Sequence, residues 1–136
     1  MNTFIEQDLY RHVGKRCKSL KYQLRYLLGT SSFLYVFLFR KASNSKVFAI
    51  RWFWIILLHF WKLVTNIQIP PGTKIDKVFR ILHFGNIVIN PDAIIGRNFN
   101  IANGVLIGVS SGKRTGVPKI GNNVYIGANA IVIGGI

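Results

Sequence analysis

The side chains that could act as acids, bases or nucleophiles are few in this sequence. Its 136 residues include three histidines, one cysteine and four acidic residues. Only one histidine, His83, lies in the glycine-rich second half of the chain. An imidazole with a pKa near neutrality is well suited to take a proton from a hydroxyl group. A lone histidine is more often structural or solvated, so His83 needs a motif around it before it can be given a role.

Other kinds of reactive site are absent from the sequence. The histidines, the cysteine and the carboxylates do not occur at metal-ligand spacing, and there is no P-loop or dinucleotide-binding glycine motif. The single cysteine, Cys17, excludes an intrachain disulfide and favours a reducing compartment. The N-terminus also lacks the charged and apolar regions of a secretory signal. We therefore expect a cytoplasmic protein without a metal centre.

The charge of the chain is strongly positive. Eighteen Lys and Arg residues face four acidic residues, which gives a net charge of +14. This balance favours an anionic partner, such as cofactor phosphates, a lipid surface or nucleic acid. No recognised nucleic-acid-binding motif accompanies the charge, so we do not expect nucleic acid to be the partner.

An isoleucine recurs every six residues through the second half, usually followed by a small residue. Ten of the 15 isoleucines between positions 67 and 136 fit this template, namely Ile69, Ile75, Ile81, Ile87, Ile89, Ile95, Ile101, Ile107, Ile120 and Ile126. A period of six fits neither an amphipathic helix nor a hairpin, and it is typical of a parallel β-helix in which three hexads close one triangular coil. We predict an α+β fold, with an α-helical region over residues 1–66 and a β-helix over residues 67–136.

The hexads contain three irregularities. The repeat shifts by two between Ile87 and Ile89, just after His83, and the 13-residue spacing from Ile107 to Ile120 predicts a loop over Val109–Pro118. Two corner positions that usually hold small residues are occupied by Phe79 and Phe99, which we expect to face the helices. We expect Pro70–Pro71 to end any preceding helix and to start the first coil.

The last coil stops at Ile136 without a cap. An uncapped coil exposes strand edges and core isoleucines. We expect either that another subunit or segment covers this end or, as the favoured alternative, that the sequence is a fragment of a longer protein.

The first half predicts three helical segments. The first covers Ile5–Leu28 and is divided by Gly14, the second covers Phe33–Lys41, and the third covers Val47–Thr65. Between the first and second, Gly29–Ser32 contains a helix stop and an N-cap.

The third segment is apolar and aromatic enough to raise the question of a membrane. Its length approaches that of a transmembrane span, but Arg51, His59 and Lys62 interrupt it. We favour a helix that packs on its neighbours and on the β-helix or another subunit. Peripheral membrane contact and a true span remain as alternatives.

Four segments of the β-helix region resemble the bacterial serine acetyltransferases, which belong to the left-handed β-helix acyltransferase superfamily. They are residues 66–75 (NIQIPPGTKI), 83–96 (HFGNIVINPDAIIG), 103–108 (NGVLIG) and 116–127 (GVPKIGNNVYIG). The start of the chain, Gln7–Arg11, and the helical first half also match. This resemblance implies a left-handed β-helix, a homotrimer with sites between subunits, and acetyl transfer from acetyl-CoA to the hydroxyl of L-serine in cysteine biosynthesis.

The resemblance also implies roles for individual residues. It makes His83 the general base and places Gln68, 15 residues earlier, where the family has an aspartate that pairs with this histidine. The residues expected to bind acetyl-CoA are Gly108, Lys113, Arg114, Lys119, Gly127 and Ala128. The residues assigned to the acceptor are Asp92 and Asn103.

Two departures from the family pattern leave alternatives open. Gln68 can orient an imidazole but cannot compensate its charge. Gly116 and Val117 replace an Arg-His pair that binds the substrate carboxylate in the family, unless Lys113 or Arg114 substitutes for it. The alternatives are therefore an O-acetyltransferase for a sugar or cell-surface polysaccharide, and a non-catalytic hexapeptide-repeat subunit.

Overall fold

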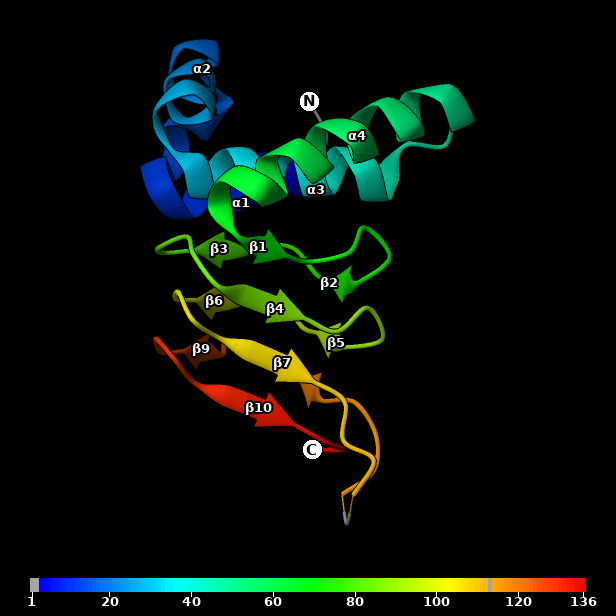
Figure 1. The fold of residues 1–136 in the computed structure, drawn as a ribbon. Coiled ribbons are helices and arrows are strands. Elements are labelled where there is room, and N and C mark those ends of the chain that lie inside the picture. Colours follow the sequence, from blue (N-terminus) through cyan, green and yellow to red (C-terminus); the bar gives the residue numbers. More distant parts are fainter. Residues whose placement is uncertain (1–2, 113) are drawn as a thin grey trace.

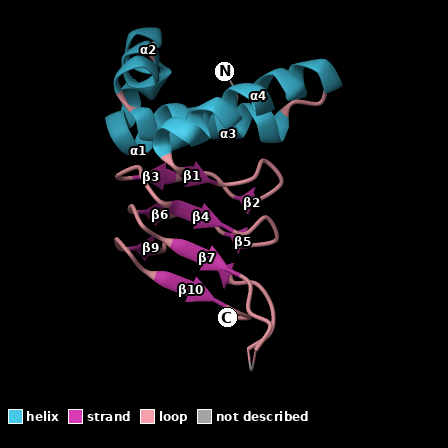
Figure 2. Ribbon diagram, in the orientation of Figure 1, coloured by secondary structure: helices cyan, strands magenta, loops and turns pink. Residues whose placement is uncertain are grey.

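The computed structural model describes residues 3–112 and 114–136. The first half of this part of the chain forms α1 (Thr3–Val13), the 3₁₀ helix η1 (Gly14–Lys18), α2 (Leu20–Gly29), α3 (Ser31–Asn44) and α4 (Phe48–Thr65). The second half forms β1 (Ile67–Gln68), β2 (Lys74–Ile75), β3 (Arg80–Ile81), β4 (Ile87–Ile89), β5 (Ile94–Ile95), β6 (Asn100–Ile101), β7 (Leu106–Gly108), β8 (Lys119–Ile120), β9 (Tyr125–Ile126) and β10 (Ile131–Ile133). The helices form a layer at one end of the strand region (Figure 2).

The helix boundaries differ from the predicted ones in small ways. The first predicted helix is divided at Gly14, whose φ of 59° is left-handed and is followed by η1. The N-cap of α3 is Thr30, inside the predicted Gly29–Ser32 segment, although its side chain makes no capping hydrogen bond. α4 ends at Thr65, as predicted, and its C-cap Asn66 adopts the left-handed conformation with φ 52° and redirects the chain into β1.

The strands form three parallel sheets with the orders β1-β4-β7-β10, β2-β5-β8 and β3-β6-β9. In Figure 1 the chain crosses the front of this region from left to right, returns behind and descends, which is a left-handed coil. The expected left-handed parallel β-helix is thus confirmed. The first coil begins at Ile67 in β1, so the expectation that Pro70–Pro71 starts it was wrong by one strand.

The isoleucines of the template form stacked columns inside the coils. The register aligns Ile75 with Ile95 and Ile120, and it aligns Ile81 with Ile101 and Ile126. A further column on the first sheet contains Ile89, Ile107 and Val132. Most of these isoleucines are buried, and each fully buried isoleucine side chain contributes about 1.5–3 kcal/mol of hydrophobic free energy.

The two phenylalanines at corners extend this core toward the helices. Phe79 and Phe99 are buried and stacked, with ring centroids 5.8 Å apart and planes 12° from parallel. Phe79 also makes an edge contact with Phe39 of α3 at 6.5 Å. Phe79 therefore faces the helical layer, as expected, and Phe99 continues the stack one coil further away.

Buried polar contacts attach the helices to the first coil. The Tyr35 hydroxyl accepts a hydrogen bond from the Ile69 N–H at 3.0 Å and donates one to the Ile69 carbonyl at 3.3 Å. Burial raises the pKa of this phenol to about 12. Asp8 of α1 and Arg40 of α3 form a buried ion pair at 2.7 Å. Arg40 also donates to the carbonyl oxygens of Ile75 and Asp76 at the end of β2.

α4 packs on α3 through one side only. The ring of Trp54 lies 6.0 Å from that of Phe37, and the Trp61 indole N–H donates to the Ser31 carbonyl at 3.0 Å. Leu58 is buried between these contacts. Within the described residues, α4 is the one helix long and apolar enough to cross a membrane by length and composition, and most of it is exposed.

Candidate active site

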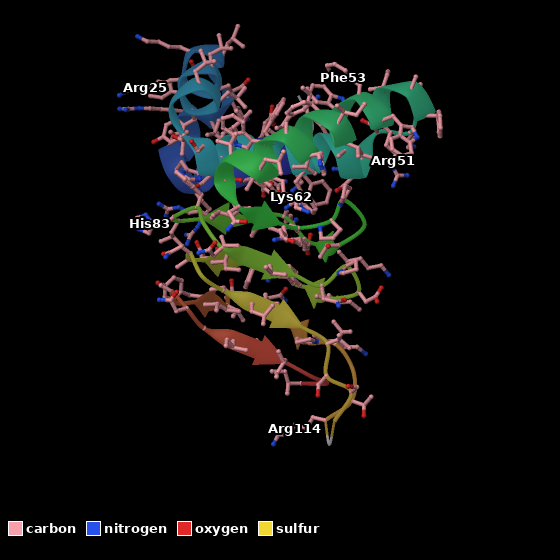
Figure 3. The ribbon with its side chains drawn as sticks, viewed as in Figure 1. Arg25, Arg51, Phe53, Lys62, His83 and Arg114 are labelled. Carbon is pink, nitrogen blue, oxygen red and sulfur yellow. The ribbon has the colours of Figure 1, made fainter. Side chains whose placement is uncertain are left out.

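His83 lies in the turn that joins β3 to β4. Ile67 pairs with Ile87, so the first coil has 20 residues, whereas Val88 pairs with Leu106, so the second has 18. The two extra residues fall in this turn and account for the shift in the repeat. They let the turn project, and Figure 3 shows His83 directed away from the β-helix at its left edge.

The imidazole of His83 is free to act on a ligand. Its side chain is exposed, and among the described residues no group forms a hydrogen bond with it. The backbone N–H groups from His83 to Asn86 also lack hydrogen-bond partners within this part of the chain. A proton acceptor beside several unpaired N–H donors can support both deprotonation of a hydroxyl and stabilisation of an oxyanion.

The backbone of the turn is held from two directions. Gly85 has a φ of 118°, which favours glycine, and its carbonyl accepts a hydrogen bond from the Gly104 N–H at 2.9 Å. The side chain of Asn86 accepts a hydrogen bond from the side-chain amide of Asn66, the residue that ends α4. The turn is therefore coupled to the helical layer on one side and to the next coil on the other.

Three of the other predicted residues lie on the same edge as His83. Beneath the His83 turn, the next coil turns at Asn103 and the one after at Gly127–Ala128. The corners are joined by backbone hydrogen bonds, including one from the Asn129 N–H to the Asn103 carbonyl at 3.0 Å. Since successive coils lie about 4.8 Å apart, Ala128 lies roughly 10 Å below the histidine turn. An elongated ligand can contact all three corners.

Gly104 lets this corner approach the next coil closely. Its φ is 72°, and a Cβ atom there would lie 2.0 Å from the Asn129 side-chain oxygen. A larger residue at this corner would have to displace the Asn129 side chain of the next coil.

Gln68 is not joined to His83. It is exposed on β1, at the outer face of the sheet β1-β4-β7-β10, and no hydrogen bond links it to the imidazole. Pairing of these two residues therefore stays a prediction.

Gln68 instead lines a groove between this sheet and α4. The groove has a volume of about 590 Å³, and its walls are mainly apolar. Gly108 lies in its floor, and His59 and Lys62 reach it from α4. Sequence reasoning treated these two residues only as interruptions of an apolar segment. Their spacing of three, which places them on one side of a helix, was the signal that they share a surface.

The remaining predicted residues lie on another edge of the prism. Asp92 is in the corner between β4 and β5, and Arg114 is in the loop between β7 and β8. Both are exposed, as is Lys119 in β8. Figure 3 places Arg114 far from His83, at the end of the β-helix farthest from the helical layer. Lys113, which was also predicted to meet CoA, lies outside the described residues.

The predicted loop leaves the coil between Gly108 and Lys119 and is folded back on itself. Ser110 and Gly116 exchange two backbone hydrogen bonds of 3.0 Å. The Arg114 carbonyl accepts a hydrogen bond from the Gly135 N–H at 3.2 Å. The loop therefore holds Arg114 beside the last coil. Gly116 and Val117, which replace the Arg-His pair of the serine acetyltransferases, follow Arg114 closely in the sequence and carry no positive charge.

Comparisons with known proteins relate the chain to acetyltransferases. No family model matches it. It is 40% identical over 72 residues to serine acetyltransferase 1, chloroplastic, of Arabidopsis thaliana, covering 52% of this chain and 23% of that protein. It is 34% identical over 84 residues to the putative colanic acid biosynthesis acetyltransferase WcaB of Escherichia coli K12, covering 59% of this chain and 52% of that protein.

A solved structure extends the similarity to the helices. Serine acetyltransferase isoform 3 of Entamoeba histolytica, in complex with cysteine, matches 97% of this chain and 47% of its own, with a TM-score of 0.72 and 28% identity. The chain thus spans about half the length of this protein and a quarter to a half of the curated relatives.

Proposed function

We propose that this chain is an acetyl-CoA-dependent O-acetyltransferase that acetylates the hydroxyl of L-serine, a step of cysteine biosynthesis. The observation that supports this best is the turn of His83. It presents an exposed imidazole to which no other described residue is hydrogen-bonded, above a stack of small-residue corners. The similarity to serine acetyltransferases in sequence and in fold supports this choice of reaction.

The reaction needs three events, and the residues of the turn can supply all of them. The imidazole of His83 takes the proton of the acceptor hydroxyl as its oxygen bonds to the thioester carbonyl carbon. Backbone N–H groups of the turn stabilise the resulting oxyanion. When the intermediate collapses, the C–S bond breaks and the CoA sulfur receives the proton from the imidazolium. The products are the O-acetyl ester and free CoA, and His83 is neutral again.

The CoA arm would follow the edge below His83. The corners at Gly127 and Ala128 present backbone rather than bulky side chains there. Gly108 would contact the arm where it crosses the neighbouring sheet. Arg114 and Lys119 would meet the CoA phosphates, as would Lys113, which lies outside the described residues. Because His83 and Arg114 lie on different edges of one chain, they can serve one site only if it lies between subunits. We therefore include a homotrimer in the proposal.

Asn103, at the corner below His83, is the better placed of the two predicted acceptor ligands. Asp92 lies on the edge that carries Arg114 and would have to come from a neighbouring subunit. We place the reaction in the cytoplasm, where acetyl-CoA is available and where the single, buried Cys17 would stay reduced. The proposal includes peripheral contact of the N-terminal helices with a membrane.

A sugar or cell-surface polysaccharide is the second candidate acceptor. Two observations favour it over serine. The chain is similar to an acetyltransferase named for colanic acid biosynthesis, and Gly116 and Val117 cannot bind an amino-acid carboxylate by charge. A non-catalytic subunit is the third candidate, because Gln68 makes no hydrogen bond with His83.

The test is a thiol-release assay with acetyl-CoA, offering L-serine beside a panel of sugars. CoA release with serine alone would support the first acceptor, and release only with sugars would replace it by the second. Substitution His83→Ala should lower the rate about 10²–10⁴-fold. Phe48→Ala, at an exposed position at the other end of α4 from this turn, is the control and should keep the rate. If the trimer is folded and no acceptor leads to release of CoA, the non-catalytic candidate remains.

A further inference from the structure

The outer side of α4 is an unusual surface for a helix exposed to water. Seven of its large apolar side chains lie on the side opposite the contacts with α3, and each of the seven is at least half exposed. They are Phe48, Trp52, Phe53, Ile56, Phe60, Leu63 and Val64. Figure 3 shows Phe53 directed away from the β-helix, whereas Arg51 and Lys62 lie on the β-helix side of α4. We call these seven residues the α4 apolar face.

α2 adds a second apolar stripe with cations beside it. Leu20, Leu24 and Leu28 recur at intervals of four, and their exposed fractions are 68%, 49% and 88%. Lys21 and Arg25 are exposed on the same helix. An apolar stripe flanked by Lys and Arg is typical of helices that lie at the surface of a bilayer. α2 and α4 both belong to the layer at the end of the molecule farthest from β10 (Figure 1).

The charge of the helical region indicates what covers these surfaces. Between Asp8 and Asp76 the sequence contains no acidic residue and 12 basic ones. Two copies that met through this layer would bring like charges together, which opposes self-association. An anionic bilayer offers both a negative surface for the cations and an apolar interior for the side chains.

The tertiary contacts of α4 argue against a transmembrane span. Its 18 residues would extend about 27 Å, so its two ends would lie on opposite sides of the hydrocarbon core. Yet α3 contacts both halves of α4, through Trp54 and Trp61, and α3 is itself bonded to Ile69 of the first coil. A span would break these contacts and draw Arg51 and Lys62 toward the hydrocarbon, where cationic side chains are unfavourable.

We infer that the helical layer binds an anionic lipid bilayer peripherally, with α4 lying in the plane of the interface. The α4 apolar face inserts at the boundary between headgroups and acyl chains. The leucines of α2 make a second insertion, and Lys21 and Arg25 contact anionic headgroups. This inference gives the lipid class and the contact surface of the proposed membrane contact. It depends on no step of acetyl transfer, which is assayed separately with soluble acceptors.

The first experiment is flotation of the 136-residue chain with vesicles. Vesicles of phosphatidylcholine with 30% phosphatidylglycerol should carry the protein upward, and pure phosphatidylcholine should carry at least tenfold less. High salt should weaken binding, because the contacts of Lys21 and Arg25 are screened. The fluorescence of Trp52, half exposed in the free protein, should shift to the blue on binding. Release by alkaline carbonate is expected, and retention in the pellet would overturn the in-plane orientation.

Matched variants test the surface itself. The double substitution Phe60→Gln with Leu63→Gln should lower the fraction bound at least tenfold. Tyr125→Gln, on β9 and of similar exposure (62% against 65% for Phe60), should not change it. Circular dichroism checks that each variant is folded. Equal binding by the double variant and the parent would refute the inference. The inference would also be refuted if the protein bound to none of the vesicles and light scattering showed copies joined through the helices.

Discussion

Removal of the Asp8 carboxylate is expected to destabilise the protein strongly. Asp8 and Arg40 are almost completely buried, with exposed fractions of 0% and 3%. Arg40 donates to Asp8 at 2.7 and 3.3 Å and to the carbonyl oxygens of Ile75 and Asp76 at 2.5 and 2.6 Å. Asp8 also accepts a hydrogen bond from the Phe79 N–H at 2.7 Å. This network joins α1 and α3 to the first coil.

The magnitude follows from what each substitution leaves behind. Burial raises the pKa of the Asp8 carboxyl, and Arg40 opposes this shift, so the pair gains little over a neutral core. Asp8→Ala, however, leaves a buried guanidinium without a counter-charge and the Phe79 N–H without an acceptor. Loss of one partner from a buried ion pair costs about 3–5 kcal/mol. The double variant Asp8→Ala with Arg40→Met removes both charges and should recover part of that loss.

The assay is urea unfolding followed by circular dichroism at one fixed protein concentration, because assembly also contributes to stability. Glu6, an acidic residue on the same helix, forms no ion pair with any described residue. Glu6→Ala is therefore the matched control and should change the unfolding free energy by less than about 1 kcal/mol. A loss below about 1 kcal/mol for Asp8→Ala would refute the reasoning. A double variant less stable than Asp8→Ala alone would also contradict it.

Two further predictions concern pH and the corner stack. Burial, with the nearby charges of Arg80 and Arg11, lowers the pKa of His12 from 6.5 to about 4. The unfolded chain therefore binds a proton that the folded chain does not, so stability is complete above pH 6.5 and falls as the pH drops toward 4. After discounting for partial exposure, we expect the unfolding free energy to fall by about 1–2 kcal/mol over this pH range. His12→Phe should flatten this part of the profile of unfolding free energy against pH, measured by denaturation. Gly104→Ala should lower the unfolding free energy by about 1–3 kcal/mol, because of the positive φ and the clash with the Asn129 side chain. Gly72→Ala, with open space at its Cβ, is the control and should lower it little. Equal midpoints of the two variants in thermal unfolding would contradict the steric argument.

The hexads were predictable because their signal is local. Each short strand places one aliphatic side chain inward, so Ile75, Ile95 and Ile101 mark their own positions without knowledge of any contact. The shift after His83 and the loop after Gly108 were visible for the same reason, since an insertion interrupts a regular count. The candidate base was found from the motif around His83, although the sequence placed Gln68 beside it and the structure shows no hydrogen bond between them.

Only the tertiary structure decided which residues meet across long stretches of sequence. Asp8 contacts the backbone of Phe79, 71 residues away, and no periodicity could identify that partner. The sequence of α4 is apolar on nearly every side, so only its packing against α3 determined which side remains exposed. Likewise, His83 and Arg114 share one motif-rich region, but the path of the coil places them on different edges. A local pattern determines whether a side chain points into or out of the coil. Its tertiary contacts depend on how coils and helices that are distant in the sequence pack together.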